Sequence, residues 1–293
     1  MNLEPVTLGT SGLGKREGAD AELADALVAS DFAQIDTSNN YAGGESERLL
    51  GEAIARAGGL PAGKVVFSKA DQDPETGVFD GDRVKRSFEE TTRRLGLDTL
   101  PLFHLHDPYT ITVAEAMAPG GAVEALVQLR EQGLVGAIGV AAGRRALVEE
   151  YVRTDAFDAV LTHNRFTLVD RSGLGIIEAA TERGMTVFNA APFGGGILAG
   201  SSSRGDTYGY QPASPELLEY IDRVHATCAE HGVPVAAAAL HFSLREPRIH
   251  STVVGIYSVK RVAGLRELLD TPIPDGFFAA IDALGTPPPT PND

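Results

Sequence analysis

The chain has 293 residues, of which 43% are hydrophobic, so it can bury a substantial core as one large domain or two small ones. Lys and Arg number 25 against 40 Asp and Glu, and this net charge of −15 argues against a nucleic-acid or anionic-membrane partner. A single cysteine, Cys228, rules out an internal disulfide, and no signal peptide or membrane-spanning apolar run is visible. We therefore expect a cytoplasmic protein.

Apolar runs and amphipathic stretches alternate along the chain and predict a repeated strand–helix order. The predicted strands are Pro5 to Gly9, Ala33 to Thr37, Val65 to Lys69, Leu102 to His106, Gly136 to Val140, Ala159 to His163, Met185 to Ala190 and Ser251 to Gly255. The predicted helices are Ser46 to Ala57, Asp82 to Leu95, Val123 to Gln132, Arg144 to Val152, Ser172 to Arg183, Pro215 to His231, Val235 to Leu244 and Val259 to Leu268. In the first helix Leu50 and Ile54 share one face, and Ser46 is a candidate N-cap.

This alternation, with strands that are apolar on both faces, indicates a parallel sheet covered by helices. Eight repeats fit a closed (β/α)8 TIM barrel of about 250 residues better than an open sheet. An open dinucleotide-binding sheet is also disfavoured because no G-x-G-x-x-G turn follows the first strand. We expect a single barrel domain over residues 1–285 and, because PPPTPND is rich in proline, a flexible tail over residues 286–293.

Four polar residues fall near the carboxyl ends of three successive predicted strands, the end of a barrel that carries active sites. Asp36 ends the second strand, and Tyr41 follows it by five residues. Lys69 ends the third strand and His106 the fourth. Taken singly, each has an ordinary explanation, as a cap, a loop anchor, a solvated strand end or a hydrogen-bonded core histidine. Their shared position favours a catalytic group.

The combination makes chemical sense as an acid–base site. Tyr41 alone is a poor proton carrier at neutral pH, because the reference pKa of tyrosine is about 10. The ammonium of Lys69 would favour the phenolate and lower this pKa, and a buried Lys69 needs a counter-charge such as Asp36. His106 can donate a hydrogen bond to the oxygen on the reacting carbon and hold it beside Tyr41.

With these residues placed, the sequence resembles the aldo-keto reductase family over nearly its whole length. The Asp, Tyr, Lys and His tetrad of that family is matched by Asp36 and Tyr41 in DTSNNYAGGESERLLGEAI, Lys69 in FSKA and His106 in FHLHDP. The segments LREQGLVGAIGV and NAAPFGGGILAG also look like family segments. The resemblance implies hydride transfer between a nicotinamide cofactor and a carbonyl or hemiacetal carbon, with Tyr41 giving or taking the proton.

The resemblance also implies where the cofactor binds. Many members use Ser-Asn after the fifth strand to bind the nicotinamide amide, where this chain has Ala141 and Ala142. Asn164 matches another amide-contacting position, and Phe193 is a substitute for the tyrosine that stacks on the ring. Gly255 stands where NADP-using relatives commonly have lysine, so NAD is expected, with NADP as the alternative. The expected cofactor-binding residues, with no metal ligand among them, are Asn164, Phe193, Gly194, Gly195, Gly196, Gly255, Ser258 and Arg261.

Two segments, THNRFTLVDRS and NAAPFGGGILAG, look most like the branch of the family that oxidises free sugars at the anomeric carbon, the D-threo-aldose or L-fucose dehydrogenases. This resemblance implies a small-molecule partner, a sugar whose cyclic hemiacetal is oxidised to a lactone. Three alternatives stay open: a pyridoxal 4-dehydrogenase-like enzyme, a general aldehyde or ketone reductase, and a non-catalytic nicotinamide-binding regulatory subunit. The sequence does not determine the oligomeric state.

Overall fold

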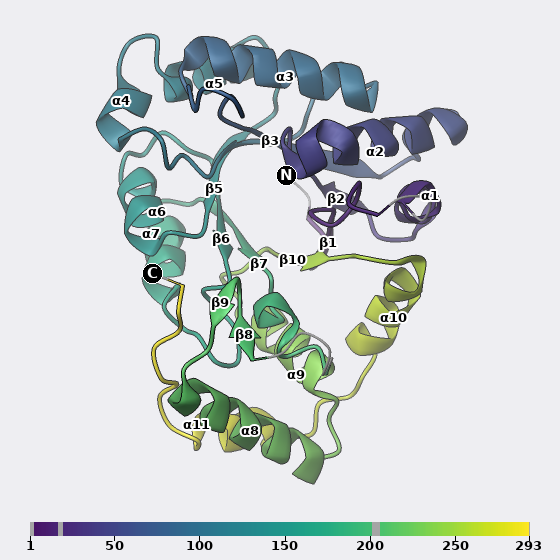
Figure 1. The fold of residues 1–293 in the computed structure, drawn as a ribbon, viewed down its shortest axis with the longest axis vertical. Coiled ribbons are helices and arrows are strands. Elements are labelled where there is room, and N and C mark those ends of the chain that lie inside the picture. The colour runs from purple at the N-terminus through teal and green to yellow at the C-terminus, as the bar shows by residue number, and fades with distance from the viewer. Residues whose placement is uncertain (1–2, 17–19, 201–205, 293) are drawn as a thin grey trace.

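Eight parallel strands close into a barrel, and helices lie around it (Figure 1). The computed structural model describes residues 3–16, 20–200 and 206–292. Around the barrel the strands follow the order β1-β10-β7-β6-β5-β4-β3-β2, so each strand has two neighbours. The predicted (β/α)8 barrel is confirmed, with all eight predicted strands present. They are β1 Val6–Gly9, β2 Gln34–Asp36, β3 Val65–Ala70, β4 Phe103–His106, β5 Ile138–Ala142, β6 Ala159–His163, β7 Thr186–Ala190 and β10 Ser251–Gly255.

The helices pack on the outer face of the barrel and include two short 3-10 turns, η1 and η2. Among the described residues, no helix is long and apolar enough to cross a membrane. The bounds are α1 Asp20–Ala29, η1 Tyr41–Gly44, α2 Glu45–Arg56, α3 Gly81–Leu95, α4 Val113–Met117, α5 Ala122–Glu131, α6 Arg145–Val152, α7 Leu174–Glu182, η2 Gly194–Gly196, α8 Pro215–Glu230, α9 Val235–Leu244, α10 Val259–Leu269 and α11 Phe277–Asp282.

Several of these elements were not predicted from the sequence. The helix α1 is rich in alanine, which gives little contrast between its two faces. The helices α4 and α11 have 5 and 6 residues, too few to show a helical period. A hairpin of two-residue strands, β8 Thr207–Tyr208 and β9 Gln211–Pro212, interrupts a segment that reads as a plain loop. The strict alternation is also interrupted, because two helices follow each other without a strand between them at α4–α5, at α8–α9 and at α10–α11.

The barrel interior is filled by side chains from alternating strand positions. Phe67 and Phe188 meet there edge to face, with their ring centroids 5.8 Å apart. Leu102, which directly precedes β4, belongs to the same interior cluster, whereas Phe103 belongs to the core between barrel and helices. Because successive strand residues point to opposite sides, this alternation directs His104 and His106 inward. His106 ends β4, and so it lies at the carboxyl end of the barrel interior.

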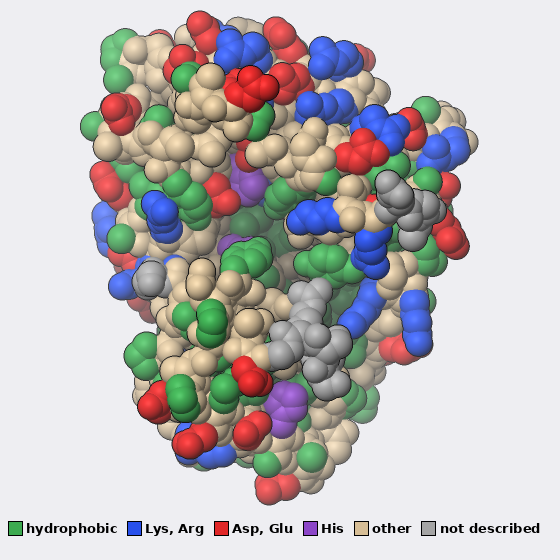
Figure 2. Space-filling model, viewed as in Figure 1, with side chains coloured by type: hydrophobic (Ala, Val, Ile, Leu, Met, Phe, Trp, Pro, Cys, Tyr) green, Lys and Arg blue, Asp and Glu red, His purple; other side chains and the backbone are tan. Residues whose placement is uncertain are grey.

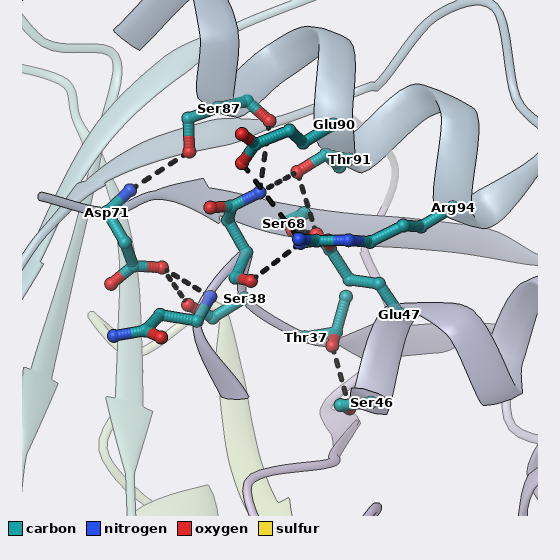
Figure 3. A network of polar contacts seen from close by, with 12 residues as sticks. Thr37, Ser38, Ser46, Glu47, Ser68, Asp71, Ser87, Glu90, Thr91 and Arg94 are labelled. Carbon is teal, nitrogen blue, oxygen red and sulfur yellow. Dashed lines mark hydrogen bonds and ion pairs between the residues drawn. The ribbon is translucent and has the colours of Figure 1, made fainter. Parts of the chain in front are cut away.

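The loop between β2 and η1 is held in place by a buried polar network that reaches α2, β3 and α3 (Figure 3). Glu47 of α2 is fully buried and accepts hydrogen bonds from the Ser68 hydroxyl at 2.7 Å, the Thr91 hydroxyl at 2.7 Å and the Arg94 guanidinium at 3.1 Å. Arg94 also donates to the carbonyl oxygen of Asn39, in the loop itself, at 2.9 Å. The loop that leads to Tyr41 is therefore anchored to three surrounding elements.

Ser46, the residue expected to cap the N-terminus of α2, is not the N-cap residue in the structure. The helix begins at Glu45 with Gly44 as its N-cap residue, so Ser46 lies within the first turn. The Ser46 hydroxyl instead contacts the hydroxyl of Thr37 at 3.0 Å and that of Thr10 at 2.9 Å. It therefore joins α2 to the ends of two barrel strands, a tertiary contact that helix-capping rules do not describe.

The end of the chain, for which the proline content predicts a flexible tail, makes specific contacts in the structure. Asn292 donates through its side chain to the carbonyl oxygen of Asn164 at 2.8 Å and to Asp170 at 3.0 Å. The Arg165 guanidinium donates to the carbonyl oxygen of Asn292 at 2.7 Å. This segment therefore returns to the barrel beside the end of β6.

Candidate active site

The structure brings together Asp36, Tyr41, Lys69 and His106, the four residues expected to form the catalytic group. Asp36 is the last residue of β2, and Lys69 is the penultimate residue of β3. The ammonium of Lys69 donates to Asp36 at 2.6 Å, to the carbonyl oxygen of Thr37 at 2.6 Å and to the Tyr41 hydroxyl at 3.2 Å. An ammonium has three donors, so all three of Lys69 are used.

Tyr41 and His106 lie side by side at the mouth of the barrel. Their ring centroids are 5.6 Å apart, and the rings meet edge to face at 81°. Since the Tyr41 oxygen already accepts from Lys69, its own O–H proton is free to point toward a substrate. Both side chains line the same cavity. An oxygen atom bound there would meet a hydrogen-bonding group from each of two elements.

Burial and charge compete in setting the proton affinities of this group. Burial raises the pKa of Tyr41 above its usual value, and the opposing effect of the Lys69 ammonium is smaller. The sequence-based expectation that Lys69 brings the pKa of Tyr41 toward neutrality is therefore wrong for the net shift, because desolvation outweighs the charge. Burial lowers the pKa of Lys69, but the charges and hydrogen bonds of Asp36 and Tyr41 together raise it by more, and the net shift is upward. Lys69 is thus an ammonium and Tyr41 a neutral phenol at neutral pH.

Two residues that sequence reasoning missed contact His106. Asp71, which follows Lys69 by two residues, lies with Oδ1 2.7 Å from Nδ1 of His106. The Ser38 hydroxyl contacts the Asp71 carboxylate and lies 3.1 Å from the same nitrogen. A signal for Asp71 was present in FSKAD, since residues two apart on a strand point to the same side. The same spacing marks Ser38, which follows Asp36 at the end of β2 by two residues.

A cavity of about 1260 Å³ opens above the catalytic group. It extends from Tyr41 and His106 to Lys260, Arg261 and Leu268 on α10. Sites for small molecules usually enclose about 300–1,000 Å³, so this one can hold a dinucleotide together with a small substrate. Figure 2 shows the hollow in the face of the molecule, with histidine side chains inside it and Lys and Arg side chains along one rim.

Most of the expected cofactor-binding residues line this cavity: Asn164, Phe193, Gly195, Gly196, Gly255, Ser258 and Arg261. Gly194 is not among the residues that line the cavity, and it packs instead against the ring of Tyr208. A Cβ atom at Gly194 would lie 2.6 Å from that ring, and its φ of +57° also favours glycine. Gly194 thus shapes the turn after β7, while its two neighbours face the cavity.

The end of β5 offers only apolar side chains to the cavity, those of Ala141 and Ala142, as the sequence implied. The end of β6 supplies His163, which was missed although it ends a predicted strand. The His163 ring stacks on the ring of Tyr210 from the β8–β9 turn, with centroids 5.8 Å apart and planes inclined by 6°. Burial lowers the pKa of His163 to about 4, so this imidazole is neutral at physiological pH.

Three features of the cavity fit a nicotinamide dinucleotide. The Oδ1 atom of Asn164 is buried and has no hydrogen-bond partner among the described residues, so it can accept from a ligand amide. The helix α10 begins beside the cavity, and no side chain in the described part of the chain caps its first turn, which leaves N–H groups for a phosphate. Gly195 and Gly196 let the backbone lie close to a ligand, because neither has a Cβ atom.

Comparison with known proteins agrees with this geometry. A sequence model of the aldo/keto reductase family matches residues 5–286. The chain belongs to this family. Among related aldo/keto reductase sequences, pyridoxal 4-dehydrogenase of Microbacterium luteolum is 28% identical over 325 aligned positions, which cover 97% of this chain and 95% of the relative.

A second relative of this aldo/keto reductase is D-threo-aldose 1-dehydrogenase of a Pseudomonas species. It is 31% identical over 205 aligned positions, which cover 69% of this chain and 62% of the relative. Among solved structures, an aldo-keto reductase of Bacillus halodurans in its holo form superposes with a TM-score of 0.80 at 18% identity, covering 97% of this chain and 93% of that one. The solved structure thus shares the barrel fold.

Proposed function

We propose that this aldo/keto reductase uses NAD to oxidise an aldose at the anomeric carbon, turning the cyclic hemiacetal into a lactone. The observation that carries the proposal is the contact between the Lys69 ammonium and the Tyr41 hydroxyl, at 3.2 Å, in the lining of a cavity of about 1260 Å³. It combines a positioned acid–base group with room for a dinucleotide and a small substrate.

The chemistry is simplest to follow in the reducing direction. The bound cofactor supplies the hydride for the carbonyl carbon. Tyr41 donates its hydroxyl proton to the carbonyl oxygen, and Lys69 stabilises the phenolate that remains. His106 holds the same oxygen by a hydrogen bond. Oxidation runs in reverse: after the phenol proton of Tyr41 has been released, the Tyr41 oxygen takes the proton of the substrate hydroxyl and the C–H hydride passes to the oxidised cofactor, so atoms and charges balance.

The choice of a hemiacetal as substrate rests on the relatives. Both named relatives are dehydrogenases, and one name specifies carbon 1 of an aldose. Pyridoxal is the alternative supported by the relative that matches nearly the whole chain. A general aldehyde or ketone reductase would use the same four residues. A non-catalytic nicotinamide-binding subunit is disfavoured, because such a protein has no need for a complete proton-transfer group.

A substrate panel tests the proposal. Purified protein is assayed with NAD and NADP against aldoses of different configuration, pyridoxal and simple aldehydes, in the direction of oxidation and of reduction. We expect reduced cofactor and lactone, identified by mass spectrometry, from at least one aldose. Lactone from pyridoxal alone would identify the alternative enzyme, and brisk aldehyde reduction without any sugar oxidation would identify a reductase. Cofactor binding without turnover of any substrate would identify a binding protein.

A further inference from the structure

Behind His106 lies a carboxylate that the reaction described above does not use. Asp71 lies directly after β3, two residues beyond Lys69, and is buried at the side of the catalytic group, with 6% of its surface exposed. Its Oδ1 atom lies 2.7 Å from Nδ1 of His106, and Ser38 also contacts both side chains. Figure 3 shows Ser38 and Asp71 facing each other next to the buried network that anchors the loop. The pair is therefore built into the scaffold.

The surroundings of Asp71 keep it ionised. Its Oδ2 atom accepts from the Ser38 hydroxyl and from the backbone N–H of Asn40, the latter at 3.0 Å, while Oδ1 faces His106. Burial raises the pKa of Asp71. The charge and hydrogen bond of His106, together with the hydrogen bonds from Ser38 and Asn40, lower it by more, so the net shift is downward. A carboxylate in this state is an acceptor only.

An ionised Asp71 determines where His106 carries its proton. Because the carboxylate can only accept, Nδ1 of His106 must be the protonated nitrogen of this contact. Ser38 agrees, since its hydroxyl donates to Asp71 and presents only lone pairs to Nδ1. Nε2 is the nitrogen left for a substrate. When His106 is neutral, Nε2 accepts a hydrogen bond, and it donates one only when the ring is a cation.

We propose that Asp71 is a positioning residue that, by keeping the proton on Nδ1, makes the charge of His106 decide what Nε2 binds. Neutral His106 accepts a hydrogen bond from a substrate hydroxyl, and cationic His106 donates one to a substrate carbonyl. The inference extends the proposed function, in which the substrate oxygen is a hydroxyl before oxidation and a carbonyl before reduction. Oxidation therefore gains, and reduction loses, as the pH rises through the pKa of His106.

Several charged or titratable groups besides Asp71 surround His106. Burial lowers the pKa of His106, but Asp71, and to a smaller extent Asp107, raise it, and the net shift is upward in spite of the Lys69 ammonium. Asp107 lies 3.8 Å from Nε2. The groups facing His106 are Asp36 of β2, Tyr41 of η1, Lys69 of β3, Asp71 directly after β3, His104 of β4, Asp107 directly after β4, and His163 of β6.

The first experiment observes His106 without any turnover. Long-range proton–nitrogen NMR spectra of the ¹⁵N-histidine-labelled protein report the tautomer and pKa of each ring, and His106→Gln identifies the signal. In the wild type we expect neutral His106 to carry its proton on Nδ1. Asp71→Asn should lower the pKa of His106 by about one unit or more, because a neighbouring opposite charge is lost. Asp82→Asn, an exposed carboxylate of α3, is the matched control and should leave the signal unchanged.

The second experiment follows kcat/KM against pH in both directions. In the wild type we expect a rising limb for oxidation and a falling limb for reduction, both at the pKa that NMR gives for His106. In Asp71→Asn both limbs should move down in pH with that pKa. The kcat for oxidation should fall by at least about tenfold, which is a smaller loss than removal of the acid–base group Tyr41 should cause. Asp82→Asn should reproduce both wild-type profiles.

The outcomes separate this inference from the proposed function. Neutral His106 protonated on Nε2 in the wild type, or an unchanged pKa in Asp71→Asn, would overturn the inference whatever the activity. The expected NMR result in a protein that turns over no substrate would leave the role of Asp71 intact and overturn the proposed function. If Asp71→Asn does not fold, the tautomer of His106 in the wild type decides whether the inference holds. Ser38→Ala removes a hydrogen bond but no charge, so it should shift the pKa of His106 by less than the shift of about one unit expected for the loss of the Asp71 charge.

Discussion

The ammonium nitrogen of Lys69 lies 3.2 Å from the hydroxyl oxygen of Tyr41 and 2.6 Å from the carboxylate of Asp36. One cation thus serves two purposes: it neutralises a buried carboxylate, and it stabilises the anion that Tyr41 becomes when it gives up its proton. The first purpose concerns folding and the second catalysis. Substitutions at these three residues can separate the two.

Tyr41→Phe should lower kcat by about a hundred- to ten-thousand-fold, the usual contribution of a general acid or base. The ring and its edge-to-face contact with His106 are kept, so cofactor affinity should change little. Single-turnover kinetics measure the chemical step, and isothermal titration calorimetry measures cofactor binding. A variant that kept most of its single-turnover rate would show that another group moves the proton.

Lys69→Met should abolish turnover and also lower the free energy of unfolding by about 3–5 kcal/mol, because Asp36 is left as a buried charge without a partner. The double variant Asp36→Asn/Lys69→Met removes both charges. We expect chemical denaturation to show that it recovers much of the lost stability, while kinetics show no recovery of activity. Equal stability of the single and double variants would contradict the ion pair as the source of the loss.

The barrel could be predicted because its signals are local and repeated. Each strand is a short apolar run, and helices such as α2 and α3 have an amphipathic stripe. The catalytic residues Asp36, Lys69 and His106 stand at strand ends that the fold brings together. The short helices and the β8–β9 hairpin could not be predicted, since two to six residues are too few to show a period.

The details of the site depend on contacts between residues far apart in the sequence. Asp71 and His106 are separated by 35 residues, and their contact follows from the pairing of β3 with β4. The net pKa shift of Tyr41 was wrong from sequence, because a sequence names the neighbouring ammonium but not the extent of burial. The place of Gly194 depends on its contact with Tyr208, which lies 14 residues further along the chain.

Glu47→Ala should lower the free energy of unfolding by about 3 kcal/mol, because Arg94 and two hydroxyl groups lose their buried acceptor. The loop before Tyr41 is tied to the same network, so kcat should fall as well. Glu52→Ala on the same helix is the matched control. Its carboxylate is exposed and pairs with Arg48 at the surface, and such pairs contribute about 0–1 kcal/mol. Urea denaturation of both variants makes the comparison, and equal losses would contradict the role of Glu47.

The enzyme should have a higher kcat/KM with NAD than with NADP. Gly255, at the end of β10, supplies no charge for the additional phosphate of NADP. Lys15, Lys260 and Arg261 line the same cavity and are cations that oppose this preference if they reach the additional phosphate. Steady-state kinetics with both cofactors and one good substrate measure the ratio, and a clear advantage for NADP would show that these cations outweigh the missing lysine.

Arg261→Ala should separate these contributions better than a lysine introduced at Gly255, where a Cβ atom would lie 3.1 Å from the ring of Tyr257 and displace it. If Arg261 meets the additional phosphate, its loss removes a charge-assisted hydrogen bond, so kcat/KM for NADP should fall about tenfold. The value for NAD should stay within about twofold. Arg266→Ala is the matched control, because Arg266 lies on the same helix but pairs with Asp31 at 2.6 Å. An equal loss with both cofactors in Arg261→Ala would instead assign Arg261 to the pyrophosphate, which NAD and NADP share, and the preference would then depend on Lys15 and Lys260.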